Sequence, residues 1–223
     1  MRRAIFLVAL VASCEREQPR PPPPPPTPPA PPALDIMIVL DLSKSMEETD
    51  LQTDRLDAAK FGLRQFVAAS PHDRIGIVIF AQQAKLLAPL GPDRKALDQT
   101  IAKIEIGDVP ELGTALGDGL ALAVDQVKGA AHKAIVVLGD GENNWVQRYD
   151  PQQAAALAKQ ASVPVYTVLV GQEDTSQLGG MSTDPKELTA IATTTGGTFT
   201  RAPSREALAQ DLAAIRATLD RPR

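Results

Sequence analysis

The sequence has few cysteines and little net charge, and each shortage excludes a class of protein. Cys14 is the only cysteine among 223 residues, so no disulfide can form within the chain. The formal net charge is −4, and Lys and Arg form no cluster, which argues against a nucleic-acid-binding surface. Beyond the first dozen residues, no apolar run approaches the roughly twenty residues that a membrane-spanning helix needs.

Motifs for nucleotide binding and for serine hydrolysis are also missing. No Gly-x-x-x-x-Gly-Lys-Ser/Thr or Gly-x-Gly-x-x-Gly sequence follows an expected strand. A Ser-His-Asp hydrolase would need a nucleophile elbow, which the sequence does not contain. His72 and His132 are isolated from each other, and we assign both to surface or structural roles. The sequence therefore favours a binding protein over an enzyme.

The N-terminal residues are expected to be an export signal. A basic Met-Arg-Arg start is followed by an apolar stretch over residues 4–11 and by small residues before Cys14. This arrangement resembles the lipobox of bacterial lipoproteins, in which the cysteine is acylated and becomes the new N-terminus. It implies a lipoprotein signal peptide over residues 1–13, lipidation at Cys14, and a place in the bacterial cell envelope, at the periplasmic or outer face of a membrane. An ordinary signal peptide with an accidental thiol is the alternative.

Residues 14–33 combine the lipidated cysteine with a proline-rich linker. Eleven of the 20 prolines lie between Pro19 and Pro32, a composition that indicates low complexity rather than a packed core. Polyproline II rises about 3.1 Å per residue, so this stretch can hold a domain roughly 40 Å from its anchor. A docking site for a proline-recognising domain is the other interpretation. Residues 34–223 are then expected to form one stand-alone folded domain.

The folded part alternates apolar strands with amphipathic helices. Hydrophobic content is 43%, as expected of a packed fold. Strands are expected at 36–40, 74–80, 84–88, 134–138, 163–170 and 198–200, and helices from 54, from 92, after 114, and over 151–161, 186–193 and 204–219. The short connection between the second and third strands predicts a hairpin, so that pair is antiparallel. Strands that are apolar throughout are typical of burial on both faces.

These features predict an α/β fold. We expect a doubly wound, Rossmann-like three-layer sandwich whose central, mostly parallel six-stranded sheet has one short antiparallel edge strand. In such sheets, ligands bind beyond the carboxyl ends of the strands, where the winding reverses. If the chain starts in the middle of the sheet and winds outward twice, the first and fourth strands are neighbours at that point.

Polar side chains stand at this expected position. Asp41, Ser43 and Ser45 follow the first strand, Asp140 follows the fourth, and Thr114 stands where the intervening helix begins. Carboxylate and hydroxyl oxygens are the donors that a hard cation such as Mg²⁺ prefers. The alternative is that these residues only cap a helix or close a turn.

The same motifs resemble those of the von Willebrand factor A domain and its metal-ion-dependent adhesion site. The sequence supplies Asp-Leu-Ser-Lys-Ser at 41–45, Gly-Thr-Ala at 113–115 and Leu-Gly-Asp-Gly at 138–141. Residues 191–201 are similar to the Ala-x-x-Thr-Gly-Gly segment of bacterial members. The resemblance covers about residues 34–220. One departure is Gly139, where many members carry Thr or Ser.

The resemblance implies a role for each of the five residues. Ser43 and Ser45 would coordinate Mg²⁺ (or Mn²⁺ or Ca²⁺) directly, Asp41 and Asp140 largely through water, and Thr114 in the ligand-ready state. An Asp or Glu of a protein partner would complete the coordination. The function implied is adhesion or scaffolding by a domain anchored to a membrane through its lipid, without catalysis and without nucleic acid.

Two rival functions stay open at this point. A phosphatase of the haloacid dehalogenase type also places an Asp after a central strand, but it wants a second Asp where Ser43 stands and an acidic pair where Asn143 and Asn144 follow the fourth strand. A metal-free scaffold with the same fold is the other rival.

Further residues are expected around the site. We expect it to be surrounded by Glu142, Asn143, Trp145, Arg148 and Tyr149. The two aromatic residues either pack on the rim of the sheet or anchor a partner. The acidic residues Glu47, Glu48 and Asp50 are expected to form a solvated face.

Overall fold

The computed structural model describes residues 33–172 and 183–220. Its strands are β1 (Asp35–Asp41), β2 (Arg74–Phe80), β3 (Ala84–Gly91), β4 (Lys133–Gly139), β5 (Val165–Val170) and β6 (Phe199–Ala202). Its helices are the 3₁₀ helix η1 (Lys44–Glu47) and the α-helices α1 (Arg55–Ala68), α2 (Arg94–Ala102), α3 (Leu116–Val127), α4 (Pro151–Gln160), α5 (Pro185–Thr195) and α6 (Arg205–Leu219). The expected signal peptide, Cys14 and the linker up to residue 32 lie outside the described residues. Within the described ranges, no helix has the length and apolar character to cross a bilayer.

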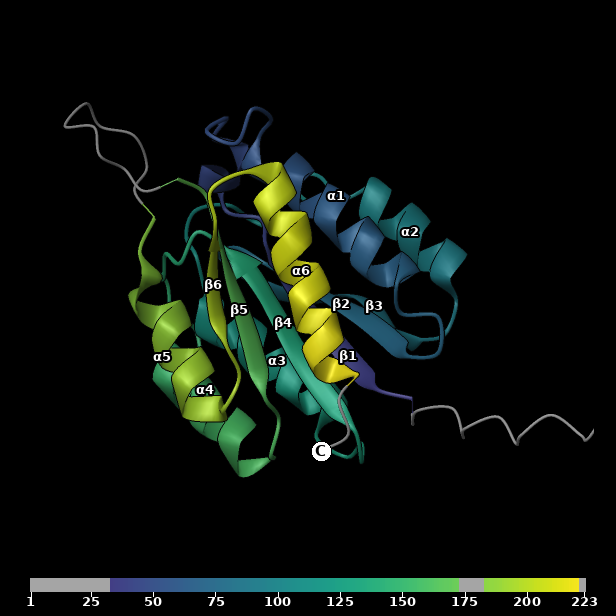
Figure 1. Ribbon diagram of the computed structural model, residues 1–223. Coiled ribbons are helices and arrows are strands. Elements are labelled where there is room, and N and C mark those ends of the chain that lie inside the picture. Colours follow the sequence, from purple (N-terminus) through teal and green to yellow (C-terminus); the bar gives the residue numbers. More distant parts are fainter. Residues whose placement is uncertain (1–32, 173–182, 221–223) are drawn as a thin grey trace, which may run out of the picture. The chain divides into compact units, whose positions relative to one another are not determined.

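A single sheet organises the domain, with β1 at its centre. The strand order is β3-β2-β1-β4-β5-β6 (Figure 1). Strand β1 pairs in parallel with both β2 and β4, and the parallel pairing continues to β5 and β6. Strand β3 alone runs antiparallel, because it follows β2 through a short hairpin. The predicted α/β sandwich with a mostly parallel six-stranded sheet is confirmed.

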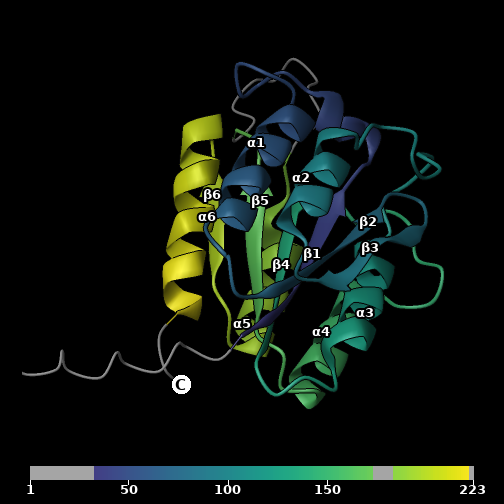
Figure 2. The same cartoon turned by 90° about the vertical axis from the view of Figure 1, so that its right-hand side faces the viewer.

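The residues of β1 alternate between two hydrophobic cores. Ile36, Ile38 and Leu40 pack against α1, α2 and α6 on one face of the sheet, whereas Met37 and Val39 pack against α3, α4 and α5 on the other. Figures 1 and 2 show the three helices on each side. Burial on both faces explains why the strand is apolar along its whole length.

Polar side chains begin most of the helices. Asp54, Asp93 and Ser204 each accept the backbone N–H of the residue three positions later, so α1, α2 and α6 start where the sequence predicts. Helix α3 differs, since Ala115 precedes it and offers no side-chain cap. The hydroxyl of Thr114 is therefore not committed to the first turn of its own helix.

Most strands differ from the prediction at one or both ends, and the largest single difference is at the end of β3. Strand β3 continues to Gly91 instead of ending at Ala88. An edge strand tolerates Pro89, because the outer side of the strand needs no N–H donor. Strand β5 begins at Val165 rather than Val163, directly after Pro164, which has no N–H to give to the ladder.

Candidate metal centre

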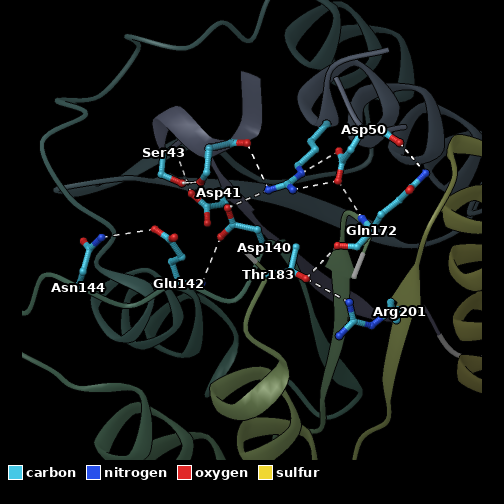
Figure 3. Close-up of polar contacts among 11 residues, drawn as sticks. Asp41, Ser43, Asp50, Asp140, Glu142, Asn144, Gln172, Thr183 and Arg201 are labelled. Atoms are coloured by element: carbon cyan, nitrogen blue, oxygen red, sulfur yellow. Dashed lines mark hydrogen bonds and ion pairs between the residues drawn. The ribbon is translucent and has the colours of Figure 1, made fainter. Parts of the chain in front are cut away.

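Asp41 and Asp140 meet at the carboxyl edge of the sheet. Leu40 pairs with Leu138 across β1 and β4, so Asp41 at the end of β1 and Asp140 just after β4 lie side by side at the switch point. Both aspartates are fully buried, and Figure 3 shows them next to each other. Gly139 provides the necessary room, because a Cβ atom there would lie 2.9 Å from Oδ2 of Asp41.

A tight turn folds Ser43 and Ser45 back toward Asp41. The N–H of Ser43 donates to Oδ1 of Asp41 at 2.8 Å. The N–H of Met46 donates to the carbonyl of Ser43 at 3.0 Å, which closes the first turn of η1. As a result, the buried hydroxyl oxygens of the two serines lie only 3.0 Å apart.

The loop after β4 holds the carboxylate of Asp140 from two sides. Its Oδ1 accepts the N–H of Glu142 at 3.1 Å, and its Oδ2 lies 3.3 Å from Nη1 of Arg55. Gly141 has a φ of +87°, and a Cβ atom there would lie 1.8 Å from the carbonyl oxygen of Asp184. The N–H of Asp184 in turn donates to the carbonyl of Asp140 at 3.0 Å. The residue before α5 therefore packs so closely on this loop that only glycine fits at position 141.

Thr114 approaches from the start of α3 and is bonded to the loop that follows β4. Its N–H donates to Oδ1 of Asn144 at 2.7 Å. Its carbonyl accepts the N–H groups of Asn144 and Trp145, each at 3.2 Å. The residue is buried, so its hydroxyl is held inside the structure rather than in bulk water. Contacts through Asn144 thus connect the Gly-Thr-Ala motif at 113–115 to the loop that follows the Leu-Gly-Asp-Gly motif at 138–141.

Negative charge is concentrated among buried groups in this region. Burial raises the pKa of Asp41 well above its usual value, and the charge of Asp140 raises it further, while hydrogen bonds from Ser43 act in the opposite direction. Burial and the charge of Asp140 also raise the pKa of Glu142. A cation placed among these groups would remove the repulsion that disfavours their ionised forms.

The available donors are oxygen atoms of the type that hard divalent cations prefer. Across residues 33–172 and 183–220, no three His, Cys, Asp or Glu side chains gather closely enough to hold a metal by themselves. The two carboxylates therefore depend on the hydroxyls of Ser43, Ser45 and Thr114 for a complete donor set. Such a set fits Mg²⁺, Mn²⁺ or Ca²⁺.

Arg55 belongs to the site, although the sequence did not indicate it. Its side chain is 3% exposed, and its Nε and Nη2 donate to the carboxylate of Asp50 at 3.0 and 2.9 Å. The expected solvated acidic face holds for Glu47, which is exposed, whereas Glu48 and Asp50 are half-buried and Asp50 pairs with a buried guanidinium. An arginine in the first turn of a helix is normally solvated, so only tertiary contacts reveal this role.

The two aromatic residues of the loop after β4 behave differently. Trp145 packs its Cβ over Gly113, yet the side chain is 40% exposed. Tyr149 is half-buried, and the guanidinium of Arg148 lies 5.1 Å from the centre of its ring. Packing therefore accounts for the tyrosine, whereas the tryptophan keeps much of its surface open beside Thr114.

Comparisons with known proteins identify the family of the domain. The family model of the von Willebrand factor type A domain matches residues 35–206. An uncharacterised protein of Borreliella burgdorferi is 32% identical over 181 residues, covering 74% of this chain and 52% of that protein. This chain spans about half the length of the curated relatives it matches.

Solved structures share the fold. An aerotolerance-related membrane protein from Bacteroides fragilis is 25% identical with a TM-score of 0.71, over 84% of this chain and 98% of that chain. Proximal thread matrix protein 1 of the mussel byssus, in a structure with a zinc-occupied MIDAS motif, is 21% identical with a TM-score of 0.68, over 85% and 46% of the two chains. With its sheet, its motifs and its match over most of its length, the chain belongs to the von Willebrand factor type A domain family.

Proposed function

We propose that the domain binds a divalent cation through Asp41, Ser43, Ser45, Thr114 and Asp140 and uses it to hold an acidic side chain of a protein partner. The observation that carries this proposal is the meeting of two buried carboxylates with a pair of serine hydroxyls 3.0 Å apart. Mg²⁺ is the expected ion, with Mn²⁺ or Ca²⁺ as substitutes, because all five side chains offer oxygen donors.

The charges of the donors favour capture of an anion. Three of the five side chains are neutral hydroxyls, so the protein supplies at most two negative charges to a divalent ion. An ion held mainly by neutral groups keeps much of its positive charge and can accept a further carboxylate. This reasoning supports an acidic side chain as the ligand of the bound ion.

The surface around the site favours a protein over a small anion. Within the described part of the chain, the large apolar side chains that are well exposed are Leu112, Trp145 and Val146, at 85%, 40% and 53%. All three lie in the loops that carry Thr114 and follow Asp140. Exposed apolar groups that gather in one place are typical of protein interaction sites, and tryptophan is a frequent anchor.

A binding role fits these residues better than catalysis. The expected phosphatase rival needs a second carboxylic acid two positions after Asp41. That position is Ser43, whose hydroxyl lies 3.0 Å from that of Ser45 and so joins the metal donors. We therefore propose a domain that binds and does not turn over a substrate.

The proposed setting is the bacterial cell envelope. The sequence suggests a signal peptide over residues 1–13 and a lipid on Cys14, followed by the proline-rich linker. The Bacteroides fragilis relative, at 25% identity, is named a membrane protein. Both observations support a domain tethered to a membrane, with its partner in the same compartment.

Titration of Mn²⁺ into the full chain tests the metal half of this proposal. The wild-type protein should bind one equivalent, and Asp41→Ala should abolish binding. Asp125→Ala is the matched control, because Asp125 is an exposed carboxylate on α3 that pairs with Lys128. Equal binding by wild type and Asp41→Ala would contradict the assignment.

Metal-dependent capture from envelope extracts tests the second claim, that the domain binds a protein partner through the ion. A partner should be retained in Mg²⁺ and released by a chelator, and Asp125→Ala should behave as wild type does. Retention that persists in chelator would favour the metal-free scaffold instead.

A further inference from the structure

We propose that Arg55 is a positioning residue that sets the charge of the metal centre. By offsetting the charge of Asp140, Arg55 lowers the affinity of the site for the cation when no ligand is present. It also raises the affinity of the bound cation for an acidic ligand. The cation and the acidic ligand then bind cooperatively. This role rests on the proposed function of the site.

The guanidinium of Arg55 is shared between two aspartates. Its Nη1 lies 3.3 Å from Oδ2 of Asp140 and 3.4 Å from the carbonyl of Ser45. Its Nε and Nη2 form a bidentate pair with Asp50 at 3.0 and 2.9 Å. One planar group thus contacts the segments that supply two of the motifs, because Ser45 and Asp140 follow different strands.

The surrounding backbone fixes the guanidinium in this place. Gly171, at the end of β5, has a φ of +133°, and a Cβ atom there would lie 2.9 Å from Nε and 3.0 Å from Cζ of Arg55. Asp50 is itself held, since the N–H of Gln172 donates to its Oδ2 at 2.8 Å and the side chain of Gln172 donates to its carbonyl at 2.7 Å. Figure 3 shows these contacts. Such a group costs little to keep ordered, because its neighbours define its position.

The charges around the ion are therefore not those of two aspartates alone. Asp41 and Asp140 contribute two negative charges, and the buried Arg55 returns one positive charge in contact with Asp140. Asp50 compensates the arginine only in part, because its side chain is 23% exposed to water, whereas that of Asp140 is fully buried. With Arg55 beside Asp140, the positive charge of a divalent ion in the site is less completely neutralised than it would be by the carboxylates alone. The remaining positive charge of the ion attracts a carboxylate. The positive charge of Arg55 repels the ion and so weakens its binding.

Neutral and charged replacements separate this electrostatic role from a structural one. Arg55→Gln keeps hydrogen-bond donors but removes the charge, so the full chain should bind Mn²⁺ about tenfold more tightly than wild type. Arg55→Lys keeps the charge and should stay close to wild type. If Arg55 only supported the structure of the site, both variants should bind Mn²⁺ more weakly than wild type.

A double variant and a matched control extend the test. Asp50→Leu with Arg55→Met replaces the whole ion pair by apolar groups of similar size and should also tighten Mn²⁺ binding. Arg64→Met with Asp98→Leu removes another bidentate pair, which joins α1 to α2 and whose arginine lies about 14 Å further along α1 than Arg55, and it should leave Mn²⁺ affinity unchanged. Acetate added as a probe carboxylate should strengthen Mn²⁺ binding in wild type and less so in Arg55→Gln.

The outcomes distinguish this inference from the proposed function. If wild type binds Mn²⁺ and Arg55→Gln binds it no more tightly than Arg55→Lys, the role of Arg55 is overturned while the metal site stands. If wild type binds no Mn²⁺, both proposals fail. Tighter binding in Arg55→Gln and in the folded double variant, with no change in the control pair, supports the inference.

Discussion

At the scale of single residues, the hydroxyl groups matter as much as the carboxylates. Ser43 and Ser45 are positioned by a hydrogen bond to Asp41 and by the turn of η1, so their oxygens are ordered before any ion binds. Thr114 is positioned differently, through the backbone contacts that connect it to Asn144. The donors therefore come from independent loops, and their removal should have separable effects.

The first prediction separates metal retention from ligand capture. Thr114→Ala removes one neutral donor and leaves both charges, so the protein should keep most of its Mn²⁺ affinity while capture of the partner falls. Asp140→Ala should lose both properties, because half of the formal negative charge of the five-residue donor set is gone. Calorimetry and metal-dependent pull-down on the same samples measure the two effects.

A threonine outside the site provides the control. Thr100→Ala removes an exposed hydroxyl from α2 that bonds only to the carbonyl of Ala96 among the contacts described, and it should change neither property. The prediction is wrong if Thr114→Ala captures the partner as well as Thr100→Ala does.

The role of Arg55 could not be predicted from the sequence. The five candidate donors could be named because strand ends, turn residues and their spacing are local features of the chain. The partners of Arg55 lie 5 and 85 positions away, at Asp50 and Asp140. Burial of this arginine depends on Gly171, the residue that follows β5, and nothing local predicts such a contact.

At the scale of elements, the sheet explains why the site lies where it does. Apolar runs and short connections were enough to predict the strands, their mostly parallel order and the antiparallel hairpin. The ends of elements were less predictable, since the extension of β3 to Gly91 depends on its place at the edge of the sheet. The close approach of the residue before α5 to Gly141 is likewise a tertiary feature.

Two glycines with positive φ give a prediction at this scale. Gly196 ends α5 at φ +77° in open space, so Gly196→Ala should cost only the left-handed strain, about 1–2 kcal/mol. Gly141→Ala adds a clash with the carbonyl of Asp184 and should cost about 3 kcal/mol or more. It should also weaken Mn²⁺ binding, because the loop of Asp140 must move.

Denaturant unfolding of both variants measures these free energies. The relevant comparison is the difference between the two alanines, which removes the strain that they share. Equal destabilisation by both would show that α5 does not press on the metal loop.

At the scale of the whole molecule, the proposed ion binding implies a link between metal and folding. The five donors come together only in the folded chain, so an ion at about a hundred times its Kd should stabilise the fold by roughly 2.7 kcal/mol. For a domain of this size a chelator should therefore lower the Tm of wild type by about 5–11 °C. Asp41→Ala should show almost no shift, and equal shifts in both proteins would mean that the chelator acts elsewhere.

The proposed lipid tether also concerns the whole chain. Acyl chains contribute about 0.8 kcal/mol of membrane affinity per buried CH₂, and two or more chains anchor a protein stably. Wild type should therefore fractionate with membranes, and Cys14→Ser should be released or incorrectly processed. Finding wild type entirely in the soluble fraction would refute lipidation at Cys14.

The most direct test of the metal centre is a crystal structure of the domain grown with Mn²⁺, with anomalous data collected for that ion. One strong peak is expected among Asp41, Ser43, Ser45 and Asp140, at roughly 2.0–2.2 Å from the two serine hydroxyls. The same experiment on Asp41→Ala should show no peak there. A wild-type crystal with full Mn²⁺ in the medium and no peak at this position, or a peak only at other residues, would contradict the central claim.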